Sequence, residues 1–280
     1  MNQRFVLAVF ASLSVLPVFA AVFYALLYSV ELTGLLSNGL TYRHWQRALS
    51  SWSFWSSLGF SLGIALQVTI VGAVLGWGLA KGLGSRLDQW PFGRAALLPL
   101  AVPSVVIGLV TFAWFTASGW SNRWLAVLGV LQDPLDGPSW VQDPWGFGII
   151  LAHVYAASAF FTIAFRGIIR MEHIDRLEHV AASLGAGTIQ TFVRITFPIL
   201  LRRSLGTSSL VFMFTVGSYE IPLLLGPQSP QMLSVLVLEK FGQYDLHQKP
   251  EAMAVAVIYA ILLTLGVHTV FHLMKEGPSE

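Results

Sequence analysis

The chain lacks cysteine and is poor in charge. Its 280 residues contain no Cys, and only 11% of them are Asp, Glu, Lys or Arg. Without cysteine there can be no disulfide framework, iron–sulfur cluster or thiol nucleophile. A soluble domain carries about a quarter charged residues, so this chain has too few to cover the surface of a globular protein of its size. These shortages argue against a soluble enzyme, a disordered chain and a disulfide-rich secreted domain.

Apolar residues, in contrast, are abundant. They make up 55% of the chain, the mean hydropathy is +0.68, and there are 10 Trp residues, a type enriched at membrane interfaces. The net charge of +2 is too small to indicate a nucleic-acid partner. The composition therefore predicts an integral membrane protein that contacts lipid.

Six stretches are long and apolar enough to cross a bilayer, which takes about 20 mostly apolar residues. We expect spans at about residues 5–30, 54–80, 95–117, 146–165, 204–225 and 251–274. This pattern predicts an all-α, polytopic fold, with residues 1–280 forming a single transmembrane domain. The first stretch begins like a signal peptide, but its apolar run continues to Val30, past the usual signal core. It is therefore interpreted as an uncleaved helix.

The basic residues predict the orientation. If the N-terminus is inside, 11 of the 16 Lys and Arg residues lie in cytoplasmic segments. That distribution satisfies the positive-inside rule and places both termini in the cytoplasm. We therefore expect a multi-pass protein of a bacterial cytoplasmic (inner) membrane.

Glycine and proline mark irregular points in the spans. Two pairs, Gly59 with Gly63 and Gly72 with Gly76, have the spacing that permits close helix packing, although glycine is common in membrane helices in any case. Proline residues at 99 and 103 are expected to bend or break the third span.

The longest cytoplasmic interval, residues 166–203, is too polar to cross the membrane, yet its middle is helix-forming. We expect Asp175 to cap a helix that ends at Gly185 or Gly187. A second short helix, 188–196, is expected to stop at Pro198.

Four apolar residues of this first helix share one face by their spacing: Leu177, Val180, Ala181 and Leu184. Such a stripe is buried either against a protein partner or at the lipid interface, and the spacing alone leaves both open.

The same interval resembles the EAA motif of the membrane subunits of binding-protein-dependent ABC importers. Four residues match the spacing of that motif: Ala181, Gly185, Ile195 and Pro198. His179 stands where the family has glutamate, and Glu178 lies one position earlier. The number of spans and the placement of the loops also resemble these permeases, in particular the branch that handles polyamines, thiamine, ferric iron and related solutes.

The resemblance implies a coupling helix that seats in a cytoplasmic ATPase subunit. The residues it assigns to this ATPase-coupling site are Arg176, Leu177, Glu178, His179, Val180, Ala181, Ala182, Leu184, Gly185 and Ala186. It also implies two ABC ATPase subunits that bind ATP and Mg²⁺, a second permease subunit (a paralogue or a second copy), and an extracytoplasmic solute-binding protein. This chain itself is then expected to hold no cofactor.

No catalytic site is predicted. A phosphate-binding loop needs Gly-Lys followed by Ser or Thr, and no lysine in the chain follows a glycine. His268 and His272 lie one helical turn apart, but without a third ligand they do not predict a metal site.

A path for a small-molecule solute is predicted from polar residues at membrane depth. Glu220 interrupts an otherwise uncharged stretch, beside Tyr219 and among Gly and Pro residues that can open a helix. An anionic group next to an aromatic ring favours a cation such as a polyamine. His153 and Ser104 are weaker members of this substrate pathway.

Two other classes stay open on the residues alone. An ion-gradient-driven secondary transporter would show inverted repeats. An intramembrane enzyme or scaffold would need catalytic polar groups on facing helices, or would need no solute path.

Overall fold

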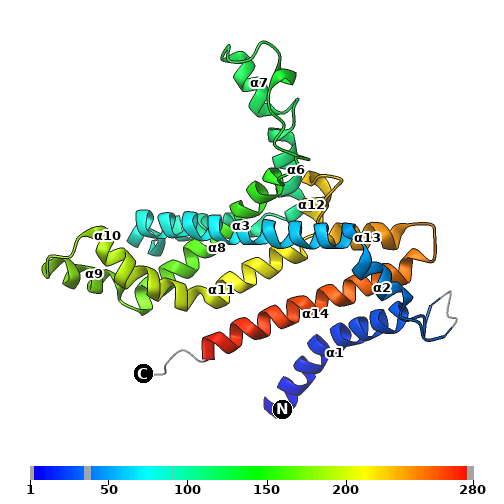
Figure 1. Ribbon diagram of the computed structural model, residues 1–280. Coiled ribbons are helices and arrows are strands. Elements are labelled where there is room, and N and C mark those ends of the chain that lie inside the picture. Colours follow the sequence, from blue (N-terminus) through cyan, green and yellow to red (C-terminus); the bar gives the residue numbers. More distant parts are fainter. Residues whose placement is uncertain (1–2, 35–38, 90, 276–280) are drawn as a thin grey trace. The chain divides into compact units, whose positions relative to one another are not determined.

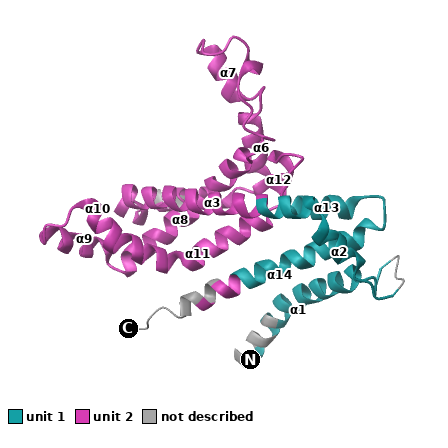
Figure 2. Ribbon diagram, in the orientation of Figure 1, with its two compact units in different colours: residues 1–59, 233–266 teal, residues 60–232, 267–280 magenta. Residues whose placement is uncertain are grey.

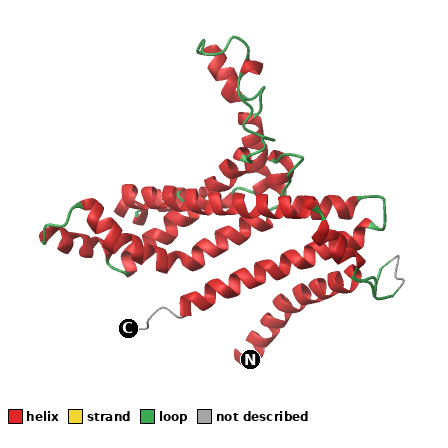
Figure 3. Cartoon of the chain, viewed as in Figure 1, coloured by secondary structure: helices red, strands yellow, loops and turns green. Residues whose placement is uncertain are grey.

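The computed structural model describes residues 3–34, 39–89 and 91–275. Within these ranges every regular element is a helix, and no strand is drawn (Figure 1, Figure 3). Residues 1–2 and 276–280, the two ends of the predicted 1–280 domain, lie outside the described part.

In the described part of the chain, longer helices are separated by one or two shorter ones. The long ones are α1 (Gln3–Ser29), α3 (Trp52–Leu83), α6 (Ser104–Phe115), α8 (Phe147–Met171), α11 (Phe197–Gly217) and α14 (Gln248–Lys275). The short ones are α2 (Arg43–Ser50), α4 (Phe92–Ala95), α5 (Leu98–Ala101), α7 (Trp120–Val127), α9 (Ile174–Ser183), α10 (Thr188–Thr191), α12 (Glu220–Leu225) and α13 (Leu233–Gly242). Two 3₁₀ turns, η1 (Gly84–Asp88) and η2 (Pro134–Asp136), and a π-helical turn, η3 (Phe192–Thr196), complete the set. Six helical stretches of the described residues are long and apolar enough to cross a membrane, which confirms the all-α, six-span fold class.

The third predicted span is not one helix. Helix α5 ends at Ala101, Val102 is extended (ψ 125°), and α6 starts at Ser104 directly after Pro103. Proline has no N–H to donate and disfavours helical backbone in the residue before it. The predicted 95–117 segment is therefore interrupted at Val102 and Pro103.

The fifth span also departs from its predicted limits. The expected stop at Pro198 is wrong, because helix continues from α10 through η3 into α11. In η3 the N–H of Phe197 bonds the carbonyl of Phe192, five residues back, and such a wider turn accommodates the missing proline N–H. At the other end the helix stops at Gly217 and restarts as α12, as the Gly and Pro content of this region predicts.

The structure divides into two compact units, residues 1–59 with 233–266 and residues 60–232 with 267–280 (Figure 2). The core of the first unit contains Ala48, Phe54, Leu58, Leu233, Leu236 and Val255. Two polar contacts lie in the same unit: a hydrogen bond of 2.6 Å between His44 Nε2 and Glu31 Oε1, and a salt bridge of 2.7 Å between Lys240 and Glu251. The single-domain organisation of the whole chain stays a prediction.

In the second unit, α3 packs closely on α8. A Cβ added at Gly72 would lie 2.9 Å from the Cβ of Ala157, and one added at Gly76 would overlap Phe161. Only glycine permits this approach, so the second predicted glycine pair is a packing surface. The first pair, Gly59 and Gly63, faces open space.

Candidate functional site

Helix α9 begins without the predicted cap. The residue before it, His173, has left-handed backbone (φ 50°), and no side chain caps the helix N-terminus. Asp175 lies inside the first turn, where its carboxylate pairs with Lys81 instead. The predicted Asp175 cap is therefore wrong, because a stronger partner from α3 attracts that carboxylate.

Helix α9 ends at Ser183, and Gly185, one of the two predicted stops, forms the turn that terminates it. Gly185 has φ +85°, and its N–H bonds the carbonyl of Ala182 at 3.0 Å. The N–H of Ala186 bonds the carbonyl of Ala181, also at 3.0 Å. This pair of bonds is the Schellman motif, which requires the left-handed backbone that glycine adopts freely.

The apolar stripe of α9 is mostly exposed. Ala181 is only 7% exposed and faces inward, whereas Leu177, Val180 and Leu184 are 41%, 59% and 83% exposed. Arg176, His179 and Ala182 are exposed too, and Ala186 is half-buried. His179 Nδ1 donates to the carbonyl of Asp175 at 2.5 Å. The outer face of α9 is thus an apolar surface that the described residues leave uncovered.

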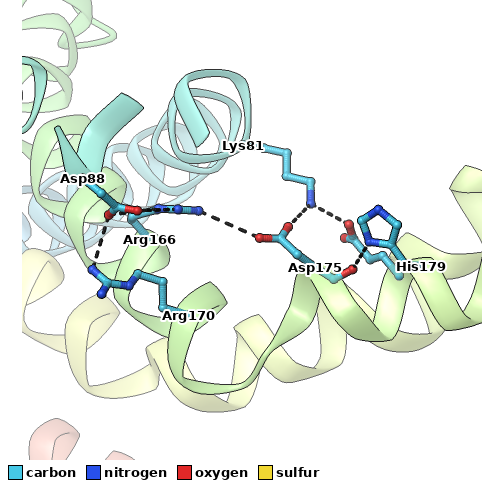
Figure 4. Close-up of polar contacts among 7 residues, drawn as sticks. Lys81, Asp88, Arg166, Arg170, Asp175 and His179 are labelled. Carbon is cyan, nitrogen blue, oxygen red and sulfur yellow. Dashed lines mark hydrogen bonds and ion pairs between the residues drawn. The ribbon is translucent and has the colours of Figure 1, made fainter. Parts of the chain in front are cut away.

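The inner side of α9 is tied to α3 by Lys81 (Figure 4). Lys81 Nζ lies 3.0 Å from Asp175 Oδ1 and 2.5 Å from Glu178 Oε2. The two carboxylates are three positions apart on one side of α9, so one ammonium group meets both. Glu178 thus faces this inner side, although the family motif places its acidic residue one position later.

A second group of ion pairs continues from this contact. Arg166 of α8 binds Asp88 at 2.6 Å and lies 4.0 Å from Asp175. Arg170 binds the other oxygen of Asp88 at 3.3 Å. The C-terminal end of α8, the turn after α3, and α9 are therefore linked by alternating charges (Figure 4).

Glu178 has a further partner. Its Oε1 accepts a hydrogen bond of 2.8 Å from Thr196, which is fully buried in η3. Trp77 packs beside the same contact, with its ring centroid 5.9 Å from Lys81 Nζ and 5.8 Å from the ring of Phe192. Both carboxylate oxygens of Glu178 are thus committed within the chain.

A cavity of about 640 Å³ lies among α5, α6, α8, α11 and α12. Most of its lining is apolar, and the lining residues include Pro99, Val102, Ala157, Phe160, Leu210 and Phe214. Three polar side chains also line it: Ser104, His153 and Thr215. Val102, at the break between α5 and α6, is one of the lining residues.

The four predicted pathway residues come together only in part. Ser104 and His153 both line the cavity. Glu220 is not among the lining residues, but its carboxylate accepts a hydrogen bond from the hydroxyl of Ser104. Tyr219 directly precedes α12 and is half-buried, and it too is outside the lining.

The polar side chains of the cavity present acceptors. His153 is 4% exposed, its Nδ1 donates to the carbonyl of Ile149 at 2.9 Å, and its Nε2 has no partner among the described residues. In a neutral ring, Nε2 is then the unprotonated acceptor. Thr215 donates its hydroxyl to the carbonyl of Val211 at 2.9 Å, and Ser104 donates to Glu220. After donating their hydrogens, the hydroxyl oxygens of Ser104 and Thr215 keep the capacity to accept, as does Nε2 of His153.

Sequence reasoning missed three contributors: Lys81, Thr196 and Thr215. Lys81 and Glu178 are 97 positions apart, and nothing local in the sequence indicates that they meet. His268 and His272 have ring centroids 6.3 Å apart. No group of three His, Asp or Glu residues in the described part of the chain could hold a metal ion.

Comparisons with known proteins place these features in a family. Residues 69–275 match the family described as "Binding-protein-dependent transport system inner membrane component". The chain is 28% identical to the sulfate transport system permease protein CysT of Synechocystis sp., over 76% of this chain and 74% of that protein. It is 24% identical to the putative 2-aminoethylphosphonate transport system permease protein PhnV of Salmonella typhimurium, over 86% and 84% of the two chains.

The fold is also found in solved structures. A chain of a bacterial ABC transporter involved in the import of the acidic polysaccharide alginate superposes with a TM-score of 0.67 at 15% identity, covering 99% of this chain and 100% of that one. A second structure of the alginate transporter, in complex with its pentasaccharide-bound periplasmic protein, gives a TM-score of 0.69 at 16% identity over 96% and 92% of the chains.

The family match covers well over half of the chain and agrees with the six candidate spans. The two named relatives concern sulfate and a phosphonate, so the narrower polyamine, thiamine and iron branch stays a prediction. The chain belongs to the binding-protein-dependent ABC transport family, as a non-catalytic, multi-pass permease component of the inner membrane.

Proposed function

We propose that the chain is the translocation subunit of an ATP-driven importer and passes a small solute delivered by an extracytoplasmic binding protein. It pairs with a second permease subunit, a paralogue or a second copy. ATP and Mg²⁺ are bound by two partner ATPase subunits, and this chain contributes the coupling helix α9 and part of the solute path.

The outer face of α9 is the observation that carries this proposal. Leu177, Val180 and Leu184 are exposed on a helix whose other side is held to α3 by the ion pairs of Lys81 with Asp175 and Glu178. A rigidly held helix with an uncovered apolar face supports docking to a protein more than loose association with lipid. We assign the ATPase contact to this face, together with Arg176, His179 and Ala182.

The cavity supports a solute path within this subunit. It lies beside two helix interruptions, at Val102–Pro103 and at Ser218, where backbone groups are freed from helical bonding. Broken helices at membrane depth occur where they line a cavity. We therefore place Ser104, His153, Glu220 and Tyr219 along or next to the route of the solute.

The chemistry of that route favours a cation or an amine-bearing solute such as a polyamine. None of the lining residues given above for the cavity is Lys or Arg, and its three polar side chains present lone pairs. Glu220 adds a carboxylate at its edge. A solute that donates hydrogen bonds and carries positive charge complements this set.

A sulfate-like oxyanion is the second candidate, and the similarity to CysT supports it. Such an anion would meet the lone pairs of the cavity and the carboxylate of Glu220 without a basic partner among the lining residues. The solute of PhnV, 2-aminoethylphosphonate, carries an amine as well as a phosphonate and lies between the two candidates.

Uptake into proteoliposomes tests both parts of the proposal. The purified complex, with its ATPase and binding protein, is offered radiolabelled spermidine, 2-aminoethylphosphonate or sulfate, with and without internal ATP. We expect ATP-dependent uptake of an amine-bearing probe. Uptake of sulfate alone would contradict the cation assignment, and uptake without ATP would contradict the importer.

A further inference from the structure

Lys81 is placed where three helical segments converge. Its ammonium group lies between two carboxylates of α9, and Trp77, one turn earlier on α3, packs against Phe192 in η3 and against Phe165 in α8. The side chain of Lys81 is 39% exposed and that of Glu178 is 23% exposed, so the pair is partly shielded from water. Partial shielding makes an ion pair stronger than one at an open surface.

Glu178 connects this lysine to the helix that follows α9. One carboxylate oxygen binds Lys81 and the other accepts from Thr196, so the side chain bridges α3 and the start of the continuous 188–217 helix. Both carboxylate oxygens therefore have a partner among the described residues. Glu178 is therefore used for an internal link.

Of the two linked helices, α11 lines the cavity, and α3 packs on α8, which lines it. On α3, Gly72 contacts Ala157, and Ala157 lines the cavity. On α11, Leu210 and Phe214 line it as well. A displacement of α9 thus reaches two walls of the cavity through contiguous close contacts, a rigid connection that packed helices transmit without deforming.

We propose that Lys81 is a positioning residue that transmits movement of α9 to α3. In this proposal Glu178 links α9 to Lys81 and Thr196 within the chain and does not contact the ATPase. This inference rests on the proposed function, in which α9 docks an ATPase. The outer face of α9 then receives the motion of the partner, and the Lys81–Asp175–Glu178 cluster passes it to the walls of the cavity.

The absence of native cysteine provides a direct readout that needs no identified solute. Phe214, which lines the cavity and is 69% exposed, is replaced in a Phe214→Cys reporter. The complete transporter in nanodiscs is treated with a maleimide, first without nucleotide and then after trapping with ATP and vanadate. The difference between the two labelling rates measures how far the ATPase state reaches the cavity, and trapped nucleotide is counted in the same sample.

In this background Lys81→Met removes the ammonium group and retains the stem, and Glu178→Gln is isosteric. We expect both variants to trap nucleotide and retain the ATPase, and we expect the labelling difference to shrink, because the underlying equilibrium shifts by up to about fivefold. Lys81→Arg should restore it. Arg86→Met is the matched control, because Arg86 is exposed and makes no ion pair among the described residues.

Two results overturn the inference. One is a labelling difference in Lys81→Met and Glu178→Gln that equals that of the parent reporter. The other is loss of the bound ATPase from Glu178→Gln, because that residue would then serve docking. If the parent chain itself retains no ATPase, the proposed function fails. ATPase binding by the parent chain is therefore measured before any variant is compared.

Discussion

The hydroxyl of Ser104 donates a hydrogen bond to the carboxylate of Glu220, 116 positions further along the chain. Ser104 is the first residue of α6 and Glu220 the first of α12, so the contact joins the two helix interruptions. The carboxylate thereby lies at the N-terminal end of α6, where the helix dipole favours a negative charge. A charged group is held at the edge of a largely apolar cavity.

Glu220→Gln tests whether that charge serves the solute. The amide has the same size but no charge, and hydrogen bonds to charged groups contribute about 1.5–3 kcal/mol. We expect the uptake efficiency for an amine-bearing probe to fall by about tenfold or more. The amount of assembled transporter should stay unchanged. Asp136→Asn, which removes an exposed carboxylate elsewhere, should be neutral. Unchanged uptake by Glu220→Gln would remove this residue from the pathway.

Gly76→Ala tests the close packing of α3 on α8. The added methyl group would overlap Phe161, which is fully buried, and overpacking costs about 1–3 kcal/mol. We expect a lower thermal unfolding temperature in detergent. Gly78→Ala on the same helix is the matched control, since its Cβ meets nothing within 4 Å. Equal stability of the two variants would contradict the packing.

Gly185→Ser tests the end of the coupling helix. A non-glycine residue in left-handed backbone costs about 1–2 kcal/mol, so amide exchange at 184–186 should become about five- to thirtyfold faster. The same substitution at Gly187, whose backbone is extended (φ −71°), places a favoured capping residue before α10 and should leave exchange unchanged. Hydrogen exchange with mass spectrometry measures the exchange rate in both variants. Equal protection of residues 184–186 in the two variants would refute the role given to Gly185.

Local patterns predicted much of the fold, because they act over a few residues. The apolar runs indicated six spans, and Pro103 and Gly217 lie at interruptions that proline and glycine chemistry favours. The stop at Gly185 followed from its position after an amphipathic stretch. Pro198 was misjudged, since the π-helical turn before it absorbs the missing N–H.

The links across the structure could not be predicted in this way. The sequence predicts that Asp175 caps α9, yet its carboxylate binds Lys81, which lies 94 positions earlier. Glu178 and Thr196 meet because the intervening turn folds back, and the lining of the cavity combines residues of five helices. Each of these contacts depends on how helices pack, which hydrophobic periodicity does not specify.

Co-purification with the ATPase tests the central claim, that the exposed face of α9 couples this permease to ATP hydrolysis. Leu184 is 83% exposed, so Leu184→Glu should not disturb the fold but should place a charge in the docking surface. Tyr244→Glu, at a fully exposed position in the loop before α14, is the control. We predict that Leu184→Glu loses the ATPase and that Tyr244→Glu retains it. A Leu184→Glu permease that still binds its ATPase at parental stoichiometry would contradict the account.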